Sequence, residues 1–426
     1  MAGEGMGNHP RKAAGALLQA CPARTLRQHR QFMPYSSSPL ILAALAAVLF
    51  SACSKEEAPA ASSTPATPAA PAKTSDYFVF YGTADGGADH GISLGHFNAD
   101  TGVLTTPTLA AQAEGPSFFT LSADGKHLYS CYEKAGKVAA YEIDPATRAL
   151  KLLNIVSSGG AGPCHISLDK TGHYALVANY DSGSLAVIAI KADGSLGDQT
   201  GADQHTGKGP DASRQDGPHA HCIITDPTNK FVLCTDLGTD KITIYKFDDK
   251  TGKISVNDPA FATVKPGAGP RHLLFNPNGK VLYCITEMGA TVNSFNWDSA
   301  KGALTEFQSI STLPADFKDF NKDAELAISP NGKFLYASAR GHDAIAVFAI
   351  DPATSGLSLV QDASAGGKTP RYFSFDPSGK WMIVGHQDSN TVAVFSVDDK
   401  TGKLTQKGAA IAAPGPICMQ YLPAAH

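Results

Sequence analysis

Two arginines, a glutamate and two histidines in the second half of the chain are the side chains best suited to chemistry on a polar substrate. Glu287, His219 and His221 are candidate general bases, because a carboxylate or an imidazole can take a proton from water. Arg271 and Arg340 carry guanidinium groups, which bind carboxylates and phosphates and can stabilise charge that develops on a carbonyl oxygen. This set would allow water to attack a carbonyl group while a cation holds its oxygen.

A sequence repeat indicates which elements position these residues. Six segments share one plan: a Pro or small residue, an apolar run, a Gly-containing turn, a second apolar run, a polar turn and a third run. The turn positions recur about 50 residues apart, at Gly125, Gly172, Asn229, Gly279, Gly332 and Gly379. Runs rich in β-branched and aromatic residues between such turns are typical of strands. Four strands in about 50 residues make one blade of a β-propeller.

A seventh blade is divided between the two ends of the repeat. Residues 77–104 supply three strands but lack the leading one, and residues 415–422 resemble a leading strand with nothing after it. Joining them closes the ring and leaves no exposed strand edge. The sequence therefore predicts an all-β, seven-bladed β-propeller over residues 77–422, closed by a C-terminal strand that joins the first blade. The abundance of Gly (41) and Pro (27) favours the same class.

The blades can be compared position by position within this one sequence. The turns and the second strands repeat almost unchanged, whereas three columns near the predicted channel mouth do not repeat at all. After the leading Pro or its equivalent stand Ser117, Cys164, His221, Arg271, Ala324 and Arg371, followed by Phe118, His165, Cys222, His272, Glu325 and Tyr372. At the end of the second strand stand Glu133, Tyr180, Leu237, Glu287, Arg340 and Gln387. Folding does not require such variation, so we interpret the columns as a site that is built once; channel side chains that merely bind water are the alternative.

From these columns we predict a catalytic set and a substrate-binding set. Glu287, His221, His219, Arg271 and Arg340 form the catalytic set. His165, His272, Arg371 and Gln387 form the substrate-binding set. His219 and His221 lie on one face of a strand and would suit half of a metal site, but no further ligands at a clear spacing complete it. We therefore expect no metal and no cofactor.

The charge of the chain bears on its possible partners. The net charge of −4 and the scattered basic residues argue against a nucleic-acid partner.

Cys222 and Cys234 flank a predicted hairpin turn, and if residues 225 and 231 face each other, so do the two cysteines. A disulfide is then feasible in an oxidising compartment. The alternative is a pair of buried thiols.

The first 76 residues lie outside the repeat. Arg24, Arg27 and Arg30 precede an apolar stretch over residues 40–50 and small residues before Cys53, which is typical of a lipoprotein-type secretory signal over residues 1–52. The stretch is too short to span a bilayer comfortably. We predict lipidation of Cys53, with an ordinary signal peptide as the alternative and Met33 as an alternative start. Residues 53–76 are rich in Ala, Pro and Ser and read as a disordered tether.

The repeat and its polar columns resemble the propeller-type lactonase family, which includes bacterial 6-phosphogluconolactonases and fungal carboxy-muconate cyclases. The resemblance covers residues 77–422 and is most specific over residues 213–248, 267–280 and 338–348. It implies a seven-bladed propeller and, from the cyclases, a catalytic His, Glu and two Arg. These fall on Glu287, Arg271 and Arg340 and on a histidine of Gly217-Pro218-His219-Ala220-His221, with His219 and His221 both open.

The resemblance implies hydrolysis of a sugar lactone to an aldonic acid. The signal implies export to the periplasm or the outer membrane, whereas 6-phosphogluconolactone is a cytoplasmic metabolite. An unphosphorylated aldonolactone or another periplasmic lactone is therefore the alternative substrate. We expect a monomer whose partner is the small lactone and whose membrane contact is the N-terminal lipid alone. The alternative function is a non-catalytic propeller that binds a ligand or protein at its mouth, since this fold does not by itself imply an activity.

Overall fold

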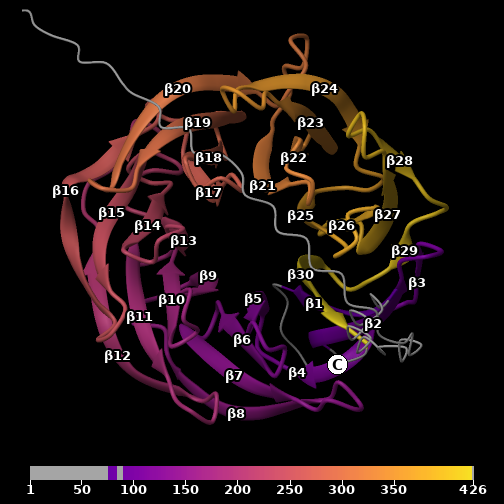
Figure 1. Ribbon diagram of the computed structural model, residues 1–426, viewed down its shortest axis with the longest axis horizontal. Helices are drawn as coiled ribbons and strands as arrows, with labels where there is room; N and C mark the ends of the chain where they lie inside the picture. Colours follow the sequence, from indigo (N-terminus) through magenta and orange to yellow (C-terminus); the bar gives the residue numbers. More distant parts are fainter. Residues whose placement is uncertain (1–74, 84–89, 425–426) are drawn as a thin grey trace, which may run out of the picture. The chain divides into compact units, whose positions relative to one another are not determined.

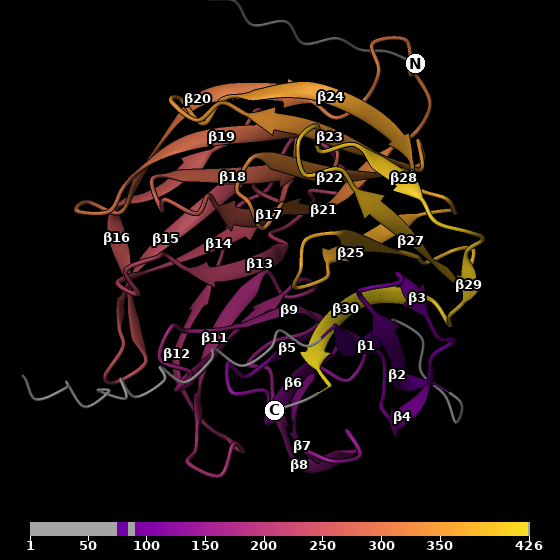
Figure 2. The same cartoon turned by 45° about the vertical axis from the view of Figure 1, so that its right-hand side comes forward.

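The computed structural model describes residues 75–83 and 90–424, and these form 30 β-strands and no helix. The strands assemble into seven antiparallel sheets arranged around a central axis (Figure 1). The innermost strands contact one another in ring order, while β8, β12, β16, β20 and β24 lie at the periphery (Figure 2). The predicted seven-bladed β-propeller is confirmed.

Six sheets are built from consecutive strands, with the first strand innermost. The second to fourth blades are β5 (Pro116–Leu121), β6 (His127–Tyr132), β7 (Lys137–Ile143) and β8 (Leu150–Ser157); β9 (Pro163–Leu168), β10 (Tyr174–Asn179), β11 (Ser184–Ile190) and β12 (Leu196–Gln204); and β13 (Ala220–Thr225), β14 (Phe231–Asp236), β15 (Lys241–Asp248) and β16 (Lys253–Thr263).

The fifth to seventh blades follow the same order. They are β17 (Pro270–Phe275), β18 (Val281–Thr286), β19 (Thr291–Asp298) and β20 (Ala303–Ser311); β21 (Lys322–Ile328), β22 (Phe334–Arg340), β23 (Ala344–Ile350) and β24 (Leu357–Ser364); and β25 (Pro370–Phe375), β26 (Trp381–His386), β27 (Thr391–Val397), β28 (Leu404–Gln406) and β29 (Ile411–Ala412).

The first blade combines both ends of the described chain. It contains β1 (Asp76–Thr83), β2 (Gly91–Asn98), β3 (Val103–Leu104), β4 (Thr108–Gln112) and, as its innermost strand, β30 (Pro416–Pro423). β30 pairs antiparallel with β1 from Tyr77 opposite Pro423 to Thr83 opposite Pro416. Cys418, Met419 and Leu422 of β30 are buried in the apolar core between blades. The predicted ring closure by a C-terminal strand is confirmed.

Each innermost strand carries an irregularity at its first residues. The register with the second strand shifts around Ser117, Cys164, His221, Arg271, Ala324, Arg371 and Ile417. A β-bulge leaves one residue out of the ladder and re-aims its side chain. The first non-repeating column of the sequence is therefore the set of bulge residues, together with Ile417 in the split blade.

The repeated turns explain the Gly column. Gly125, Gly172, Gly279, Gly332 and Gly379 have positive φ angles between 68° and 74°, and Asn229, which replaces Gly in the fourth blade, has φ of 59°. This left-handed conformation suits Gly and, among other residues, Asn. The turns thus repeat because their backbone conformation repeats.

The cysteine hypothesis is wrong in its register. Thr225 pairs with Val232, so Cys222 lies opposite Thr235 and Cys234 opposite Ile223. A shift of one residue moves a side chain to the other face of the sheet. The two thiols are therefore not opposed, and all six cysteines of the described residues are buried and unbonded to one another.

The predicted signal over residues 1–52, Cys53 and most of the predicted tether lie outside the described residues, so these stay predictions. In the described part, no helix has the length and apolar character needed to cross a membrane.

Candidate active site

Glu287 is the centre of a buried cluster of charges. It follows β18 directly, and its side chain is 6% exposed. Its Oε2 accepts hydrogen bonds from Nε of Arg271 at 3.2 Å and from Nη2 of Arg340 at 2.9 Å. Arg271 is the bulge residue of β17 and Arg340 ends β22, so two adjacent blades deliver these groups to one point. Three members of the predicted catalytic set are thus in direct contact.

A third guanidinium, which the sequence prediction did not include, completes the cluster. Nη2 of Arg214 donates to Oε1 of Glu287 at 2.7 Å and to the Tyr180 hydroxyl at 3.1 Å. Its Nη1 is buried and has no hydrogen-bond partner. Arg214 lies in the loop between β12 and β13, outside the repeating blades. Comparison of blade positions therefore had no column in which to find it.

The loop that carries Arg214 is fixed by its neighbour. Gln215 is fully buried, and its amide donates to Oδ1 of Asp240 at 2.8 Å and to the Leu237 carbonyl at 2.9 Å. Asp240 also accepts backbone NH groups of Gly267 and Gly269. These bonds tie the loop to the neighbouring blade and so help to hold Arg214 against Glu287.

The cluster determines the ionisation of Glu287. Burial alone would raise the pKa of this carboxyl, but the guanidinium groups of Arg340, Arg271 and Arg214 outweigh it and lower the pKa to about 2. Glu287 is therefore ionised at neutral pH and fully engaged with cations. A carboxylate of such low basicity is a poor proton acceptor, since general bases work best with a pKa near the operating pH.

His219 lies beside this cluster with a defined hydrogen-bonding pattern. Its Nδ1 is 3.0 Å from the Tyr180 carbonyl oxygen, and its ring stacks on the Tyr180 ring at 4.4 Å. A carbonyl oxygen only accepts, so Nδ1 carries the proton and Nε2 has its lone pair available. Nε2 lies 3.7 Å from Asp216 at the partly exposed mouth.

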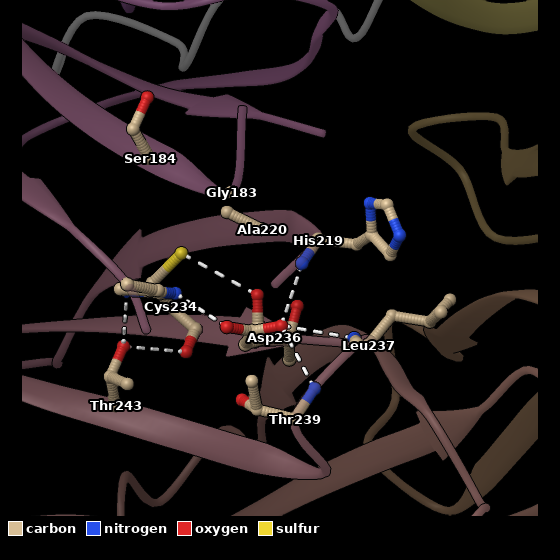
Figure 3. A network of polar contacts seen from close by, with 12 residues as sticks. Gly183, Ser184, His219, Ala220, Cys234, Asp236, Leu237, Thr239 and Thr243 are labelled. Carbon is tan, nitrogen blue, oxygen red and sulfur yellow. Dashed lines mark hydrogen bonds and ion pairs between the residues drawn. The ribbon is translucent and has the colours of Figure 1, made fainter. Parts of the chain in front are cut away.

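Asp236 fixes the backbone of His219. Its Oδ1 accepts the NH groups of His219 at 2.8 Å, Gly238 at 2.9 Å and Thr239 at 3.1 Å (Figure 3). The other oxygen is 2.9 Å from Nδ1 of the buried His205. Figure 3 shows the His219 ring directed away from Asp236.

His221, His272 and His165 lie deeper and contact one another. The rings of His221 and His272 are 5.2 Å apart, and those of His272 and His165 are 5.4 Å apart. Burial first, and then nearby positive charge, holds the pKa of each imidazole well below its usual value. All three are neutral at pH 7. Nδ1 of His221 and Nε2 of His272 are buried without a partner.

Two buried carboxyl groups accompany these histidines. Glu325 is 3.1 Å from Nδ1 of His272, and burial raises the pKa of Glu325 to about 8 despite the opposing effect of Arg271. Burial likewise raises the pKa of Asp323 to about 7, against hydrogen bonds from Thr312 and Asn321. At neutral pH, Glu325 is mainly in its uncharged form.

The remaining predicted residues occupy the same end of the ring. Arg371, the bulge residue of β25, lines a pocket together with Arg271, Glu133 and Ser117. Gln387 follows β26 and donates its backbone NH to the Thr369 carbonyl at 3.0 Å. Within the described residues no hydrogen bond or ion pair joins its side chain to the arginine cluster.

As for metal ions, the described ranges hold no group of three or more His, Cys, Asp or Glu side chains arranged as ligands. The donor set at the mouth consists largely of guanidinium groups, which cannot coordinate a cation.

Comparison with known proteins identifies close similarity over the whole ring. The family model described as "Lactonase, 7-bladed beta-propeller" matches residues 78–421. The 6-phosphogluconolactonase of Bacillus subtilis is 34% identical over 349 residues, which cover 81% of this chain and 98% of the relative. The 6-phosphogluconolactonase of Formosa agariphila is 33% identical and covers 79% of this chain and 96% of its own length.

A solved structure gives the same result in three dimensions. The periplasmic gluconolactonase of Pseudomonas aeruginosa superimposes with a TM-score of 0.77 at 29% sequence identity, covering 82% of this chain and 99% of that protein.

Proposed function

The chain belongs to the seven-bladed β-propeller lactonase family, and we propose that it uses the arginine–glutamate cluster and His219 to open a sugar lactone with water, giving the aldonic acid. Lactone hydrolysis is the activity of the relatives; which residues perform it here is the proposal. One observation carries it. Three guanidinium groups meet at one buried carboxylate, and one of their nitrogens, Nη1 of Arg214, is buried with no partner.

The unpartnered nitrogen suits the charge that forms during the reaction. When water adds to the lactone carbonyl, the carbonyl oxygen becomes negative, and preorganised donors in a buried site stabilise it. Arg214 can donate through Nη1 without giving up its bonds to Glu287 and Tyr180. Glu287 then serves to hold the three cations together, and it does not take the proton.

His219 supplies the base. Its Nε2 takes a proton from the attacking water, and the carbonyl of Tyr180 keeps the imidazole in the required tautomer. The carbon–oxygen bond to the ring oxygen then breaks, and that oxygen takes a proton from the imidazolium to become a hydroxyl. We assign to His221, which is neutral and has an unpaired Nδ1, a hydrogen bond to a substrate hydroxyl.

Exchange of each histidine for glutamine tests this division of roles. We expect His219→Gln to lower kcat by about 10²–10⁴-fold with little change in KM. His221→Gln should mainly raise KM, because it removes one hydrogen bond to the substrate. Both constants follow from acid release, corrected for spontaneous hydrolysis. If kcat instead collapses in His221→Gln while His219→Gln stays active, His221 is the base and His219 binds the substrate.

The same assay decides between the enzyme and the alternative of a non-catalytic binding propeller. Acid release from δ-gluconolactone and from its 6-phosphate is followed with the wild-type protein and with His219→Gln. Acceleration of either reaction by the wild type, lost in the variant, supports the lactonase site. If both lactones hydrolyse no faster with the wild-type protein than without it, a non-catalytic binding role is favoured.

We also propose that the protein is exported and anchored by lipid at Cys53, as a monomer. The signal pattern of residues 1–52 supports export, and a periplasmic gluconolactonase is among the similar structures. In a bacterial host that processes lipoproteins, intact-mass measurement should show a chain that starts at a lipidated Cys53. Cys53→Ser should prevent this processing. A soluble wild-type chain that retains Met1 or Met33 would contradict the proposal.

A further inference from the structure

Two cations at the channel mouth have no acidic partner. Around the mouth, four arginine and lysine side chains form ion pairs. Arg214, Arg271 and Arg340 pair with Glu287, and Lys368 pairs with Asp343. In the described part of the chain, neither Lys322 nor Arg371 forms an ion pair. Both side chains are partly buried. Such cations lose part of their hydration without gaining a negative partner in the protein. This is unfavourable unless a bound anion supplies the missing negative charge.

The two cations stand at the same end of adjacent innermost strands, because β21 and β25 contact each other. Lys322 begins β21, where its backbone carbonyl accepts Nε of Arg340 at 3.2 Å, and Arg371 is the bulge residue of the next blade. Burial and the positive charges of Arg214, Arg340 and Arg371 hold the pKa of Lys322 below its usual value, against the attraction of Glu287. The charges of these residues therefore act on the Lys322 ammonium group.

The surroundings do not neutralise this charge. The cations named at the mouth are Arg214, Arg271, Arg340, Arg371, Lys322 and Lys368, and the acids named there are Glu287, Glu133, Glu325, Asp323, Asp216 and Asp343. Glu287 is already shared by three arginines, and burial keeps Glu325 mainly protonated at neutral pH. Asp323 is fully buried, and its carboxyl group accepts hydrogen bonds from Thr312 and Asn321. Within this set of named groups, the positive charge exceeds the available negative charge.

Lys322 is also held in place. Its Nζ lies 5.3 Å from the centre of the Phe320 ring, and Phe320, in the loop between β20 and β21, is 74% exposed. A cation over an aromatic face is attracted by the ring without losing its charge. The ammonium group is thus positioned at the rim while its charge stays available.

We propose that Lys322 and Arg371 form a subsite for an anionic substituent of the lactone, a phosphate or a carboxylate, and that Lys322 sets the preference for charged over neutral lactones. The subsite rests on the proposed lactonase function, because it assigns one part of that substrate. Arg271, Arg340 and Arg214 act on the reacting carbonyl, and Lys322 and Arg371 bind the group at the other end of the molecule.

The kinetic test compares substrates that differ in charge. We measure kcat/KM for δ-gluconolactone, its 6-phosphate and the carboxylate-bearing glucarolactone in the wild type, Lys322→Gln and Lys322→Arg. Lys322→Gln should lower the ratio of charged to neutral kcat/KM by about 10–100-fold, as expected for loss of a hydrogen bond between charged groups. Lys322→Arg should restore most of it. The phosphate and carboxylate substrates distinguish the two possible substituents.

Lys318→Gln is the matched control, because Lys318 lies in the loop that leads into β21 and, among the described residues, donates a hydrogen bond only to the Ala315 carbonyl. It removes the same charge and should leave the ratio unchanged. Equal losses on charged and neutral lactones in Lys322→Gln, or a similar loss in Lys318→Gln, would overturn the subsite. Thermal melting of each variant identifies any loss of folding.

A binding measurement separates the subsite from the proposed reaction. Calorimetric titration with 6-phosphogluconate, glucarate and gluconate needs no turnover. One outcome is a wild type that hydrolyses none of the lactones and yet binds 6-phosphogluconate or glucarate, each of which has two anionic groups, more tightly than gluconate. If Lys322→Gln then loses this preference, the proposed function fails and the subsite stands. Equal binding of the three acids by the wild type overturns the subsite even if hydrolysis is confirmed.

Discussion

Glu287→Gln should lower kcat/KM for lactone hydrolysis by about 10²–10³-fold and also destabilise the protein. The amide keeps the shape of the side chain but removes the charge that holds Arg214, Arg271 and Arg340 together. Loss of ordered donors to a developing oxyanion typically has an effect of this size. Removing one partner of a buried ion pair commonly costs about 3–5 kcal/mol, because the other charges remain buried. Activity assays and denaturant unfolding measure the two effects.

The pH dependence gives an independent check. The pKa of Glu287 is lowered from 4.5 to about 2 in the folded protein, so its ionised form contributes stability above the unfolded-state value. This contribution, about 3 kcal/mol as an order of magnitude, is lost as the pH falls from about 4.5 to 2. The wild type and Glu287→Gln should therefore converge in stability at low pH. A constant difference across this range, or an active and stable variant, would contradict the role of Glu287.

Deleting residues 414–424 should prevent the ring from closing. The deletion removes β30, exposes the edge of β1 and uncovers the core around Cys418, Met419 and Leu422. The loss should exceed about 5 kcal/mol, which is comparable to the whole stability of many domains. Aggregation, or a large fall in the melting temperature, is the expected result. An unchanged melting temperature would contradict the closure.

A permuted chain distinguishes the effect of losing the β30 pairing from the effect of shortening the chain. The backbone NH of Ala424 donates to the Asp76 carbonyl at 2.9 Å, so the end of β30 lies beside the start of β1. Placing residues 414–424 ahead of residue 75 through a short linker keeps the strand and changes only its connection. This variant should melt close to the wild type. If it melts like the deletion, the connection to β29 matters more than the pairing with β1.

The repeating parts of this fold were predictable because each blade solves the same local problem. The turn at Gly279 and the one at Asn229 need the same left-handed backbone, so the signal recurs in sequence. The Cys222–Cys234 register was not predictable, because the turn between Thr225 and Val232 is one residue longer than expected and displaces the pairing of Cys222 by one residue. Sequence symmetry identifies a hairpin without fixing its register.

The site was only partly predictable for a related reason. Arg271, Glu287 and Arg340 stood out because a uniform scaffold made their variation visible, and the structure brings them together. Arg214 and Lys322 were missed as site residues, since the first lies in an irregular loop and the second precedes the compared columns. Gln387 stood in a compared column, but its position alone did not show where its side chain would go.

The pairing of β1 with β30 also constrains how the protein reaches its folded state. Tyr77 lies opposite Pro423, so this ladder forms between segments from the two ends of the described chain. Such non-local contacts slow folding, because a long loop must close before they form. The other six blades can assemble from local hairpins as synthesis proceeds. The first blade must wait for the last strand, and until then β1 presents an open edge to other chains.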